Sequence, residues 1–296
     1  MSPFFQHTLA GSVSVSGVGV HTGQPVTVTL RPAPADSGVT FRRVDVEGKD
    51  QDIPARTLAV VRTQLGTVIA NADGVSVSTV EHLMAALGAL GVDNARVDID
   101  GPEAPIMDGS AQAFVEAIDR AGRRRQDAPR RYLEILSPVE VTEGDKRATL
   151  SPADGFEVAF EIAFDSSAIG RQRIDLALDE RTFRAELADS RTFGFLHEVE
   201  ALRAAGLARG GSLENVVVIE GDEVANPEGL RRPDEFVRHK ALDAVGDLAL
   251  LGAPILGRYE GVYAGHGLNN AVSRALLANP AAWRFSAWRE ALAEAV

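Results

Sequence analysis

Residues 234–251 read DEFVRHKALDAVGDLALL, and their apolar positions recur with the period of a long amphipathic helix. Residues four apart on a helix lie on one face, so His239 and Asp243 can point at a single metal ion. Asp247 lies one turn further along and continues that face. Taken alone, His239 and Asp243 are more simply interpreted as a surface pair on an acidic helix. Partners elsewhere in the chain must therefore decide whether this helix carries a site.

Two short motifs, far from this helix in sequence, supply such partners. Residues 78–81, Ser-Thr-Val-Glu, form a capping-box pattern ahead of an apolar-periodic run, which predicts a helix that begins at about Thr79. Glu81 and His82 then lie in the first turn of that helix. The second motif is Gly265-His266-Gly267.

Each of these residues has a plainer explanation when it is considered singly. Glu81 can be a helix cap, and His82 and His266 can be packed or surface histidines. Together, His82, His239 and Asp243 supply two imidazoles and one carboxylate and leave a fourth position for water. That is the layout of a catalytic zinc site.

The composition is that of an ordinary globular protein, with 45% hydrophobic and 24% charged residues. A chain of 296 residues is long enough for two domains. The formal net charge of −12 argues against binding to nucleic acid or to an anionic membrane surface. The lack of cysteine excludes disulfides, thiolate zinc sites, iron–sulfur clusters and a cysteine nucleophile. Any metal must therefore be held by nitrogen and oxygen ligands.

The N-terminal residues predict no signal peptide. Residues 1–11 lack the charged start and apolar run of a signal peptide, and no stretch approaches membrane-spanning length. We therefore expect a cytoplasmic, reducing compartment and no integral membrane segment. The sequence gives no indication of a protein partner.

The first part of the chain predicts a mixed sheet with helices. Alternating apolar residues in 11–20 and 26–30 predict the two strands of a hairpin, with residues 21–24 as its turn. Residues 92–99 predict a further strand, and residues 111–121 a second helix.

A shift in composition separates the two parts of the chain. Residues 122–131 hold five arginines, a proline and no large apolar residue, which is typical of a solvated linker; a binding patch is the alternative. The second part repeats the style of the first, with strands predicted at 132–141, 148–150, 156–164 and 216–219 and a mostly helical segment at 183–207.

Six motifs of this chain resemble those of the UDP-3-O-acyl-N-acetylglucosamine deacetylases, the zinc amidases of lipid A synthesis. They keep the family's order, and the resemblance extends from about Thr8 to about Leu277. The motifs are residues 16–23 (SGVGVHTG), 78–83 (STVEHL), 105–110 (PIMDGS), 191–195 (RTFGF), 236–247 (FVRHKALDAVGD) and 265–270 (GHGLNN).

The resemblance implies an α+β fold of two similar domains, each a layer of helices packed on a mixed β-sheet, with the active site between them. Residues 1–126 would form the first domain and supply Glu81 and His82. Residues 127–296 would form the second and supply the remaining metal and proton-transfer residues. An insert at about 193–223 would line a passage for the substrate's acyl chain, although core packing explains its apolar residues equally simply.

The reaction that the resemblance implies is hydrolysis of the N-acetyl group of UDP-3-O-(3-hydroxyacyl)-N-acetylglucosamine, the committed step of lipid A biosynthesis. It releases acetate and the free glucosamine amine. Zinc would be held by His82, His239 and Asp243, and iron(II) can occupy the same ligands. The UDP-linked sugar is the only partner that we expect.

Four further residues would carry out the proton transfers and stabilise charge. Glu81 would take a proton from the attacking water. The Thr192 hydroxyl and a protonated His266 would stabilise the oxyanion, and His266 would then protonate the departing nitrogen. Asp247 would orient His266 and raise its pKa.

Substrate contacts are expected from a second group of residues. Lys240 would reach the sugar or the diphosphate rather than the metal. Phe193 and Phe195 would face the sugar and the acyl chain, and Phe164 would stack on uracil. His21 is assigned to substrate binding as well, with turn structure as an equal alternative.

The chain departs from the family pattern at two places near the nucleotide. Tyr263 and Ala264 stand where a lysine and a serine are expected before Gly265, and Ala163 stands where an acidic residue often precedes Phe164. The diphosphate and uracil contacts therefore differ from those of better-known members, whereas the metal and proton-transfer residues are intact.

Two other classes of protein fit parts of the pattern. Two histidines and a carboxylate are also the facial triad of non-haem iron oxygenases, but such enzymes do not need a general base like Glu81 beside a ligand. A non-catalytic module that binds nucleotide sugars around a structural metal is the second alternative. A structural zinc usually has four protein ligands, and only three are apparent here.

Overall fold

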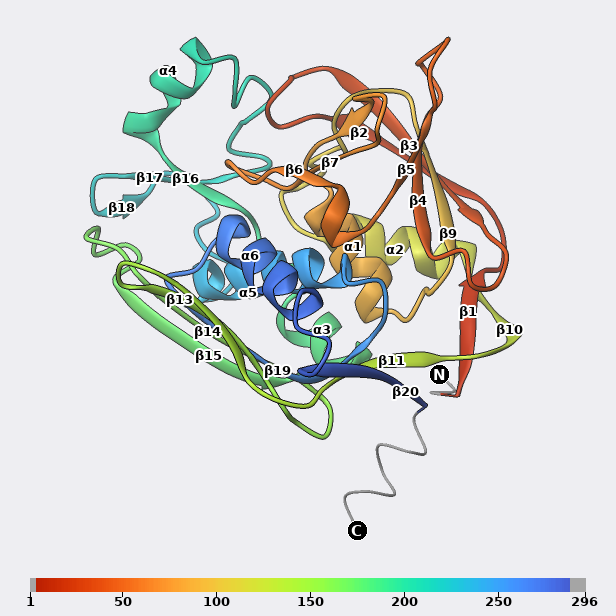
Figure 1. The fold of residues 1–296 in the computed structure, drawn as a ribbon. Helices are drawn as coiled ribbons and strands as arrows, with labels where there is room; N and C mark the ends of the chain where they lie inside the picture. Colours follow the sequence, from red (N-terminus) through yellow and green to blue (C-terminus); the bar gives the residue numbers. More distant parts are fainter. Residues whose placement is uncertain (1–3, 288–296) are drawn as a thin grey trace.

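Helices from both halves of the chain pack against one another in the centre of the molecule, between two β-sheets (Figure 1). A computed structural model describes residues 4–287. Both large sheets contain parallel and antiparallel strand pairs, which confirms the predicted α+β class. The order of layers is sheet, helices, helices, sheet, so the helices of each half meet at the middle of the molecule.

The first sheet has five strands in the order β2-β3-β9-β4-β5. β2 and β3 form the predicted hairpin, in which Val18 pairs with Pro25 across the turn. Only the β4–β9 pair is parallel. The strands are β2 (Val13–Val18), β3 (Pro25–Pro32), β4 (Val39–Arg43), β5 (Asp52–Pro54) and β9 (Ala95–Ile99), and the helices of this half are α1 (Glu81–Ala89) and α2 (Gln112–Ala121).

A small three-stranded sheet is inserted between β5 and α1. A short 3₁₀ helix, Thr57–Ala59, precedes it. The strands of the small sheet are β6 (Val60–Arg62), β7 (Val68–Ala70) and β8 (Ser76–Val77), which pair in chain order. Figure 1 places β6 and β7 above the N-terminal end of α1.

The second sheet has seven strands, and β19 is its centre. β19 pairs in parallel with β11 and β14 and antiparallel with β13. The strands are β11 (Arg131–Ile135), β12 (Val139–Glu143), β13 (Lys146–Ser151), β14 (Phe156–Ala163), β15 (Arg171–Ala177), β19 (Ile255–Val262) and β20 (Trp283–Ala287), and the helices are α3 (Glu180–Glu186), α5 (Glu235–Ala249) and α6 (His266–Leu277).

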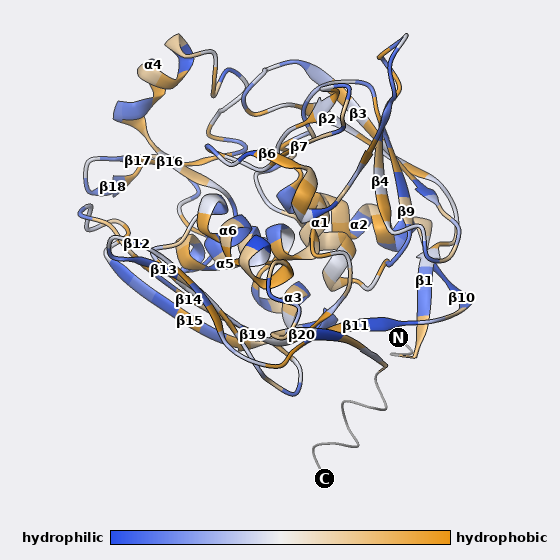
Figure 2. Ribbon diagram, in the orientation of Figure 1, coloured by the Kyte–Doolittle hydropathy of each residue, from blue (hydrophilic) through white to orange (hydrophobic). Residues whose placement is uncertain are grey.

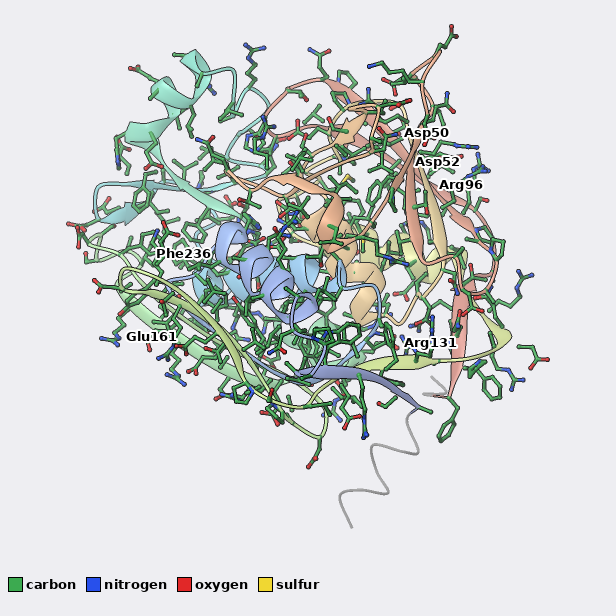
Figure 3. All side chains as sticks on the ribbon, viewed as in Figure 1. Asp50, Asp52, Arg96, Arg131, Glu161 and Phe236 are labelled. Carbon is green, nitrogen blue, oxygen red and sulfur yellow. The ribbon has the colours of Figure 1, made fainter. Side chains whose placement is uncertain are left out.

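The outer side of this sheet is polar. Figure 2 shows hydrophilic residues along the outermost strand, β15, and hydrophobic stretches on the central helices. Glu161, labelled in Figure 3, pairs with Arg171 and lies 3.5 Å from Arg173, which also reaches Glu260 at 3.3 Å. The core therefore lies on the helix side of the sheet.

The segment predicted as mostly helical at 183–207 is only partly so. α3 ends at Glu186, and residues 193–195 form the strand β16 (Phe193–Phe195) before α4 (Leu196–Ala204) begins. β16 is a strand because it pairs in parallel with β17 (Val217–Glu220), which in turn pairs with β18 (Glu223–Val224). The predicted strand at 216–219 is confirmed as β17.

The arginine-rich stretch at 122–131 is largely exposed, as expected of a connector, but it is a strand and not an irregular linker. Its residues form β10 (Arg123–Pro129), which pairs antiparallel with β1 (Phe5–Leu9). Arg123 forms a 2.9 Å ion pair with Glu180. The polar connection between the halves is thus a strand because β1 offers it an edge to pair with. The expected domain boundary between residues 126 and 127 falls inside β10. Within residues 4–287, no helix combines the length and apolar character needed to cross a membrane.

Candidate metal centre and active site

The site is built where α1 of the first half crosses α5 of the second. At the crossing, Gly246 leaves no room for a side chain, since an added Cβ would meet the carbonyl group of Glu81. Further along the helix pair, an added Cβ on Gly88 would lie 3.2 Å from the Cβ of Ala249. This close approach brings the residue after Glu81, His82, against the face of α5 that carries His239.

Three buried side chains converge at this crossing. The Nε2 atoms of His82 and His239 lie 3.5 and 3.3 Å from Oδ1 of Asp243. One candidate ligand atom from each residue lies within 4.8 Å of the other two. The two imidazole rings are 5.0 Å apart and nearly perpendicular. The spacing predicted from the sequence therefore does bring two nitrogens and one oxygen to one point.

The donor atoms at this point are the ones that a divalent cation needs. Oδ1 of Asp243 is buried and has no hydrogen-bond partner, which is costly for a carboxylate oxygen unless another ligand takes it up. Nδ1 of His239 lies 3.0 Å from the carbonyl oxygen of Ser190, which can only accept a hydrogen bond, so the proton is on Nδ1 and the lone pair of Nε2 faces Asp243.

The charge states of the ligands suit a metal as well. Burial alone would raise the pKa of the Asp243 carboxyl, but His239, Lys240 and His266 hold it well below its usual range. Burial lowers the pKa of His239 to about 4, against the opposing effect of Asp243. A neutral imidazole and an ionised carboxylate are the forms that coordinate metal.

Glu81 does not cap α1 in the way that the capping box predicts. It is the first residue of the helix, Val80 occupies the N-cap position, and no side chain caps the helix there. One carboxylate oxygen, Oε2, instead accepts a 2.9 Å hydrogen bond from the amide of Thr67. The other, Oε1, faces the site, 3.9 Å from Nε2 of His266. Burial raises the pKa of Glu81, despite the opposing effects of the nearby imidazoles.

His266 begins α6 and is held by α5. Its Nδ1 atom lies 2.8 Å from Oδ2 of Asp247, and its Nε2 atom lies 3.8 Å from Oδ2 of Asp243. Burial would lower the pKa of His266, but the surrounding carboxylates, of which Asp247 acts most strongly, raise the pKa to about 9. In the metal-free protein this environment favours the cationic imidazole at neutral pH.

Asp247 is fixed by two further side chains, Thr67 and Asn269, and a third, Tyr259, holds Asn269; the sequence pattern assigned no role to these three. Thr67 donates to Oδ1, and Asn269 donates to Oδ2 at 2.8 Å. The hydroxyl of Tyr259 in turn donates to the Asn269 side-chain oxygen. Asn269 lies inside the GHGLNN motif and could have been suspected, whereas nothing near Thr67 or Tyr259 in sequence signals a site.

Lys240 contacts one of the candidate metal ligands directly. Its ammonium lies 2.7 Å from Oδ2 of Asp243, the oxygen that is not shared with the two imidazoles. Its side chain is 18% exposed, so the ammonium can also reach a group bound in front of the site. The expected contact with sugar or diphosphate stays a prediction.

The three predicted phenylalanines form one aromatic cluster beside His239. Phe164 lies 5.8 Å from both Phe193 and Phe195, measured between ring centroids. Phe193 lies 5.0 Å from Phe236, which Figure 3 labels on α5, and 6.3 Å from the ring of His239. The structure therefore brings these rings together next to the three candidate metal ligands, on the side of the 193–223 segment.

Thr192 is placed by its backbone between the two halves. Its amide donates to the carbonyl of Gly109 at 2.8 Å, and its own carbonyl accepts from Val217. Thr192 also follows, by two residues, the Ser190 carbonyl that orients His239. Its assigned role at the oxyanion stays a prediction.

His21 lies in the hairpin turn, as expected, and joins two loops. Its Nε2 atom lies 3.0 Å from the carbonyl oxygen of Leu65, and its Nδ1 atom accepts from the amide of Ala208 at 3.4 Å. An added Cβ on Gly66 would lie 3.1 Å from the Glu81 carboxylate and 3.9 Å from the His21 ring. The structure thus places His21 close to Glu81, although it forms no direct bond to it.

A large cavity lies away from this cluster, toward the opposite ends of α1 and α5. Its volume is about 1160 Å³, and Leu87, Arg56, Phe156 and Leu248 are among its lining residues. It contains none of the candidate ligands or proton-transfer groups. Donor chemistry is the better guide to a hydrolytic site than volume, so we place the site at the cluster.

Comparisons with known proteins agree with the motifs. A family described as UDP-3-O-acyl N-acetylglycosamine deacetylase matches residues 6–278. Three curated relatives carry the name UDP-3-O-acyl-N-acetylglucosamine deacetylase. The one from Phenylobacterium zucineum (strain HLK1) is 68% identical over 99% of this chain and 100% of its own length. Those from Anaeromyxobacter sp. (strain Fw109-5) and Neisseria meningitidis (strain FAM18) are 53% and 47% identical, over 96% and 94% of this chain and 92% of each relative.

Proposed function

Because the chain belongs to the UDP-3-O-acyl N-acetylglycosamine deacetylase family, we propose that it is a metal-dependent amidase of lipid A biosynthesis. It removes the N-acetyl group of UDP-3-O-(3-hydroxyacyl)-N-acetylglucosamine and releases acetate and the free amine. This is the committed step of the pathway, and we place it in the cytoplasm.

One observation carries the metal dependence. The buried Oδ1 atom of Asp243 has no hydrogen-bond partner and faces the Nε2 atoms of two imidazoles. His82, His239 and Asp243 would hold Zn²⁺, or iron(II) where that ion is more available. The chemistry that such an ion supplies is acidification of water and polarisation of the acetamide carbonyl.

Glu81 is the group that would take the proton from the attacking water. Its Oε2 atom is occupied by the Thr67 amide, so Oε1 is the oxygen available to the water. The raised pKa brings the carboxyl nearer to neutrality, where proton transfer by a general base is most effective. Its place in the chain, immediately before the ligand His82, keeps the base and the metal site in fixed relation.

His266 would act on the other side of the reacting carbon. As a buried cation it can donate from Nε2 to the developing oxyanion and then to the departing glucosamine nitrogen. Asp247 holds Nδ1 and so keeps Nε2 directed into the site. The Thr192 hydroxyl would be a second donor to the oxyanion.

The remaining residues would bind the substrate. The ammonium of Lys240 would reach the sugar or the diphosphate. Phe193 and Phe195 would contact the sugar and the acyl chain, Phe164 would stack on uracil, and His21 would line the same opening. The 193–223 segment would form the acyl passage, which agrees with the aromatic cluster at its start.

The experiment that tests this proposal is acetate release from the acylated UDP-sugar. Wild type should release acetate, lose this activity on chelation and regain it with Zn²⁺. Glu81→Ala at equal metal occupancy should lose nearly all of it, whereas Glu116→Ala, at an exposed position on α2, should not. No release from a folded, zinc-loaded wild type would refute the substrate, and oxygen uptake with iron in its place would favour an oxygenase.

A further inference from the structure

Glu103 is a buried carboxylate that no lysine or arginine of residues 4–287 neutralises. Glu103 is 1% exposed. Oε1 accepts from the amide of His21 at 2.9 Å and from the Thr79 hydroxyl at 3.1 Å. Oε2 accepts from both the amide and the hydroxyl of Thr22 at 2.8 Å. Four donors thus replace the water that the carboxylate loses on burial.

The surrounding backbone leaves just enough room for this carboxylate. Gly19, on the other limb of the hairpin turn, could carry no side chain, because an added Cβ would meet Glu103 and the Thr22 hydroxyl. The turn closes through a 2.9 Å hydrogen bond from the amide of Gly23 to the carbonyl of Gly19. The turn of residues 19–23 is therefore wrapped around the Glu103 side chain.

A first connection leads from Glu103 to the proposed general base along the chain. Thr79 has a φ of 57°, in the left-handed region that a β-branched residue rarely adopts. The strain is held in place by the hydroxyl bond to Glu103 and by backbone bonds between Ser78 and the 102–104 segment. Glu81 follows Thr79 by two residues, so the conformation at Thr79 sets where Glu81 begins α1.

A second connection leads through His21. Glu103 fixes the backbone of His21, and the ring then bonds the carbonyl of Leu65 at 3.0 Å. The two residues after Leu65 lie beside the Glu81 carboxylate. Gly66 lies against Oε1, and the Thr67 amide donates to Oε2. Both carboxylate oxygens of Glu81 are thus placed by a loop that the Glu103-bound turn supports.

The same turn also seats the segment from the second half. The amides of Arg209 and Gly210 donate to the carbonyls of His21 and Val20. An added Cβ on Gly210 would meet the carbonyl oxygen of Gly19 and the backbone of Gly23, so there is no room for a side chain at residue 210. Residues 208–211 therefore pack against the turn that Glu103 holds in place.

We propose that Glu103 is a positioning residue for the reaction, which aligns the Glu81 carboxylate through Thr79 and through the His21–Leu65 contact. The inference rests on the proposed function of Glu81. Glu103 touches neither the ligands nor the base, so its effect is transmitted by the two connections and not by its own chemistry.

The bonding pattern requires a carboxylate. Glutamine has the same shape but presents an NH₂ group at one of the two oxygen positions. Either orientation sets that NH₂ against a backbone N–H, of His21 at one position or of Thr22 at the other. Glu103→Gln should therefore shift the 19–23 turn without leaving a cavity.

The test compares Glu103→Gln with Asp93→Asn, a matched change elsewhere. Asp93 is also a largely buried carboxylate that accepts a backbone amide, from His7, but it pairs with Arg130 and has no contact with the site. Glu103→Gln should lower kcat for acetate release tenfold to a hundredfold at unchanged metal content. Asp93→Asn should stay within twofold of wild type, even if both variants lose similar thermal stability.

Amide hydrogen exchange provides a readout that does not depend on the substrate. In Glu103→Gln the amides of His21 and Thr22 should exchange faster. If the proposed connection holds, the Thr67 amide, which bonds Glu81, should also exchange at least tenfold faster. Protection at Thr67 equal to wild type would overturn the proposal, as would an unchanged kcat or an equal loss of kcat in Asp93→Asn.

A second variant and the exchange measurement distinguish a failure of this inference from a folding defect and from a failure of the proposed function. If Glu103→Gln does not fold, Thr79→Val keeps the branched shape and removes only the hydroxyl bond; a kcat equal to wild type in that variant would overturn the proposal. If wild type releases no acetate, the proposed function fails, but exchange at Thr67 still decides whether Glu103 governs the setting of Glu81.

Discussion

His266 and Asp247 form a 2.8 Å hydrogen bond between Nδ1 and Oδ2, and the two residues come from different helices, α6 and α5. The carboxylate therefore acts across the join of two elements and fixes both the direction and the charge of the imidazole. Since the pKa of His266 is raised to about 9 in the metal-free protein, the charged form predominates there throughout the neutral range.

The raised pKa makes a prediction about stability in the metal-free protein. A histidine whose pKa is higher in the folded state stabilises the fold fully below its unfolded pKa of about 6.5, and this contribution is lost as the pH rises through about 9. The difference in unfolding free energy between wild type and His266→Asn should therefore shrink between pH 6.5 and 9. Urea denaturation in the presence of chelator measures it, and a difference that is constant across this range would contradict the raised pKa.

The ligand residues and the base should separate in their effects on metal content. His239→Ala and Asp243→Ala should each lower bound zinc, because each removes one of three protein ligands. Glu81→Ala should keep zinc and lose most turnover. Metal analysis of the purified variants checks this, and equal zinc loss in all three would reject the division of roles.

His266→Ala should lower kcat about a hundredfold or more while it spares bound zinc, since general acid catalysis contributes factors of this order. The rate of wild type should also depend on pH with a bell shape, reporting the coupled base and acid as properties of the whole site. An unchanged rate in the variant would remove His266 from catalysis.

Gly246→Ala should weaken metal binding without touching a ligand. The added methyl group would meet the carbonyl of Glu81 and push α1 away from α5, so His82 would move away from Asp243. Titration with zinc against a competing chelator should show a weaker affinity. Gly155→Ala is the control, because nothing lies within 4 Å of an added Cβ there.

The buried ion pair at the start of α5 should matter for stability. Arg191 and Glu235 are 2.9 Å apart, with side chains 3% and 1% exposed. Arg191→Met leaves the Glu235 carboxylate buried without its main partner and should destabilise the protein by about 3–5 kcal/mol. Chemical denaturation measures this. A double change of Arg191 and Glu235 to methionine should recover part of the loss, and a cost equal to the sum of the single changes would show that the two residues do not interact.

Much of the site could be predicted because its residues share local patterns. The spacing of His239 and Asp243 on a helix is visible in the sequence, and the motif around His82 supplied the third ligand. The structure brings all three together. The hairpin and the long helix were predicted for the same reason, since the period of apolar residues is a local property.

The failures share a cause as well. The arginine-rich stretch became β10 only because β1, more than a hundred residues earlier, offers it a pairing edge. Ser78 and Glu81 have the spacing of a capping box, but the Thr67 amide takes the Glu81 carboxylate instead. Thr67 and Glu103 lie in unremarkable sequence, because their importance depends entirely on which distant residues the fold sets beside them.

The contact of Gly246 with the backbone of Glu81 has a mechanical consequence. At this point the two helices meet through backbone atoms, with no side chain between them that could repack, so the contact opposes sliding of α1 along α5. We therefore expect Glu81 and His82 to keep their positions relative to α5 when a substrate binds, so that little reorganisation accompanies the proposed reaction.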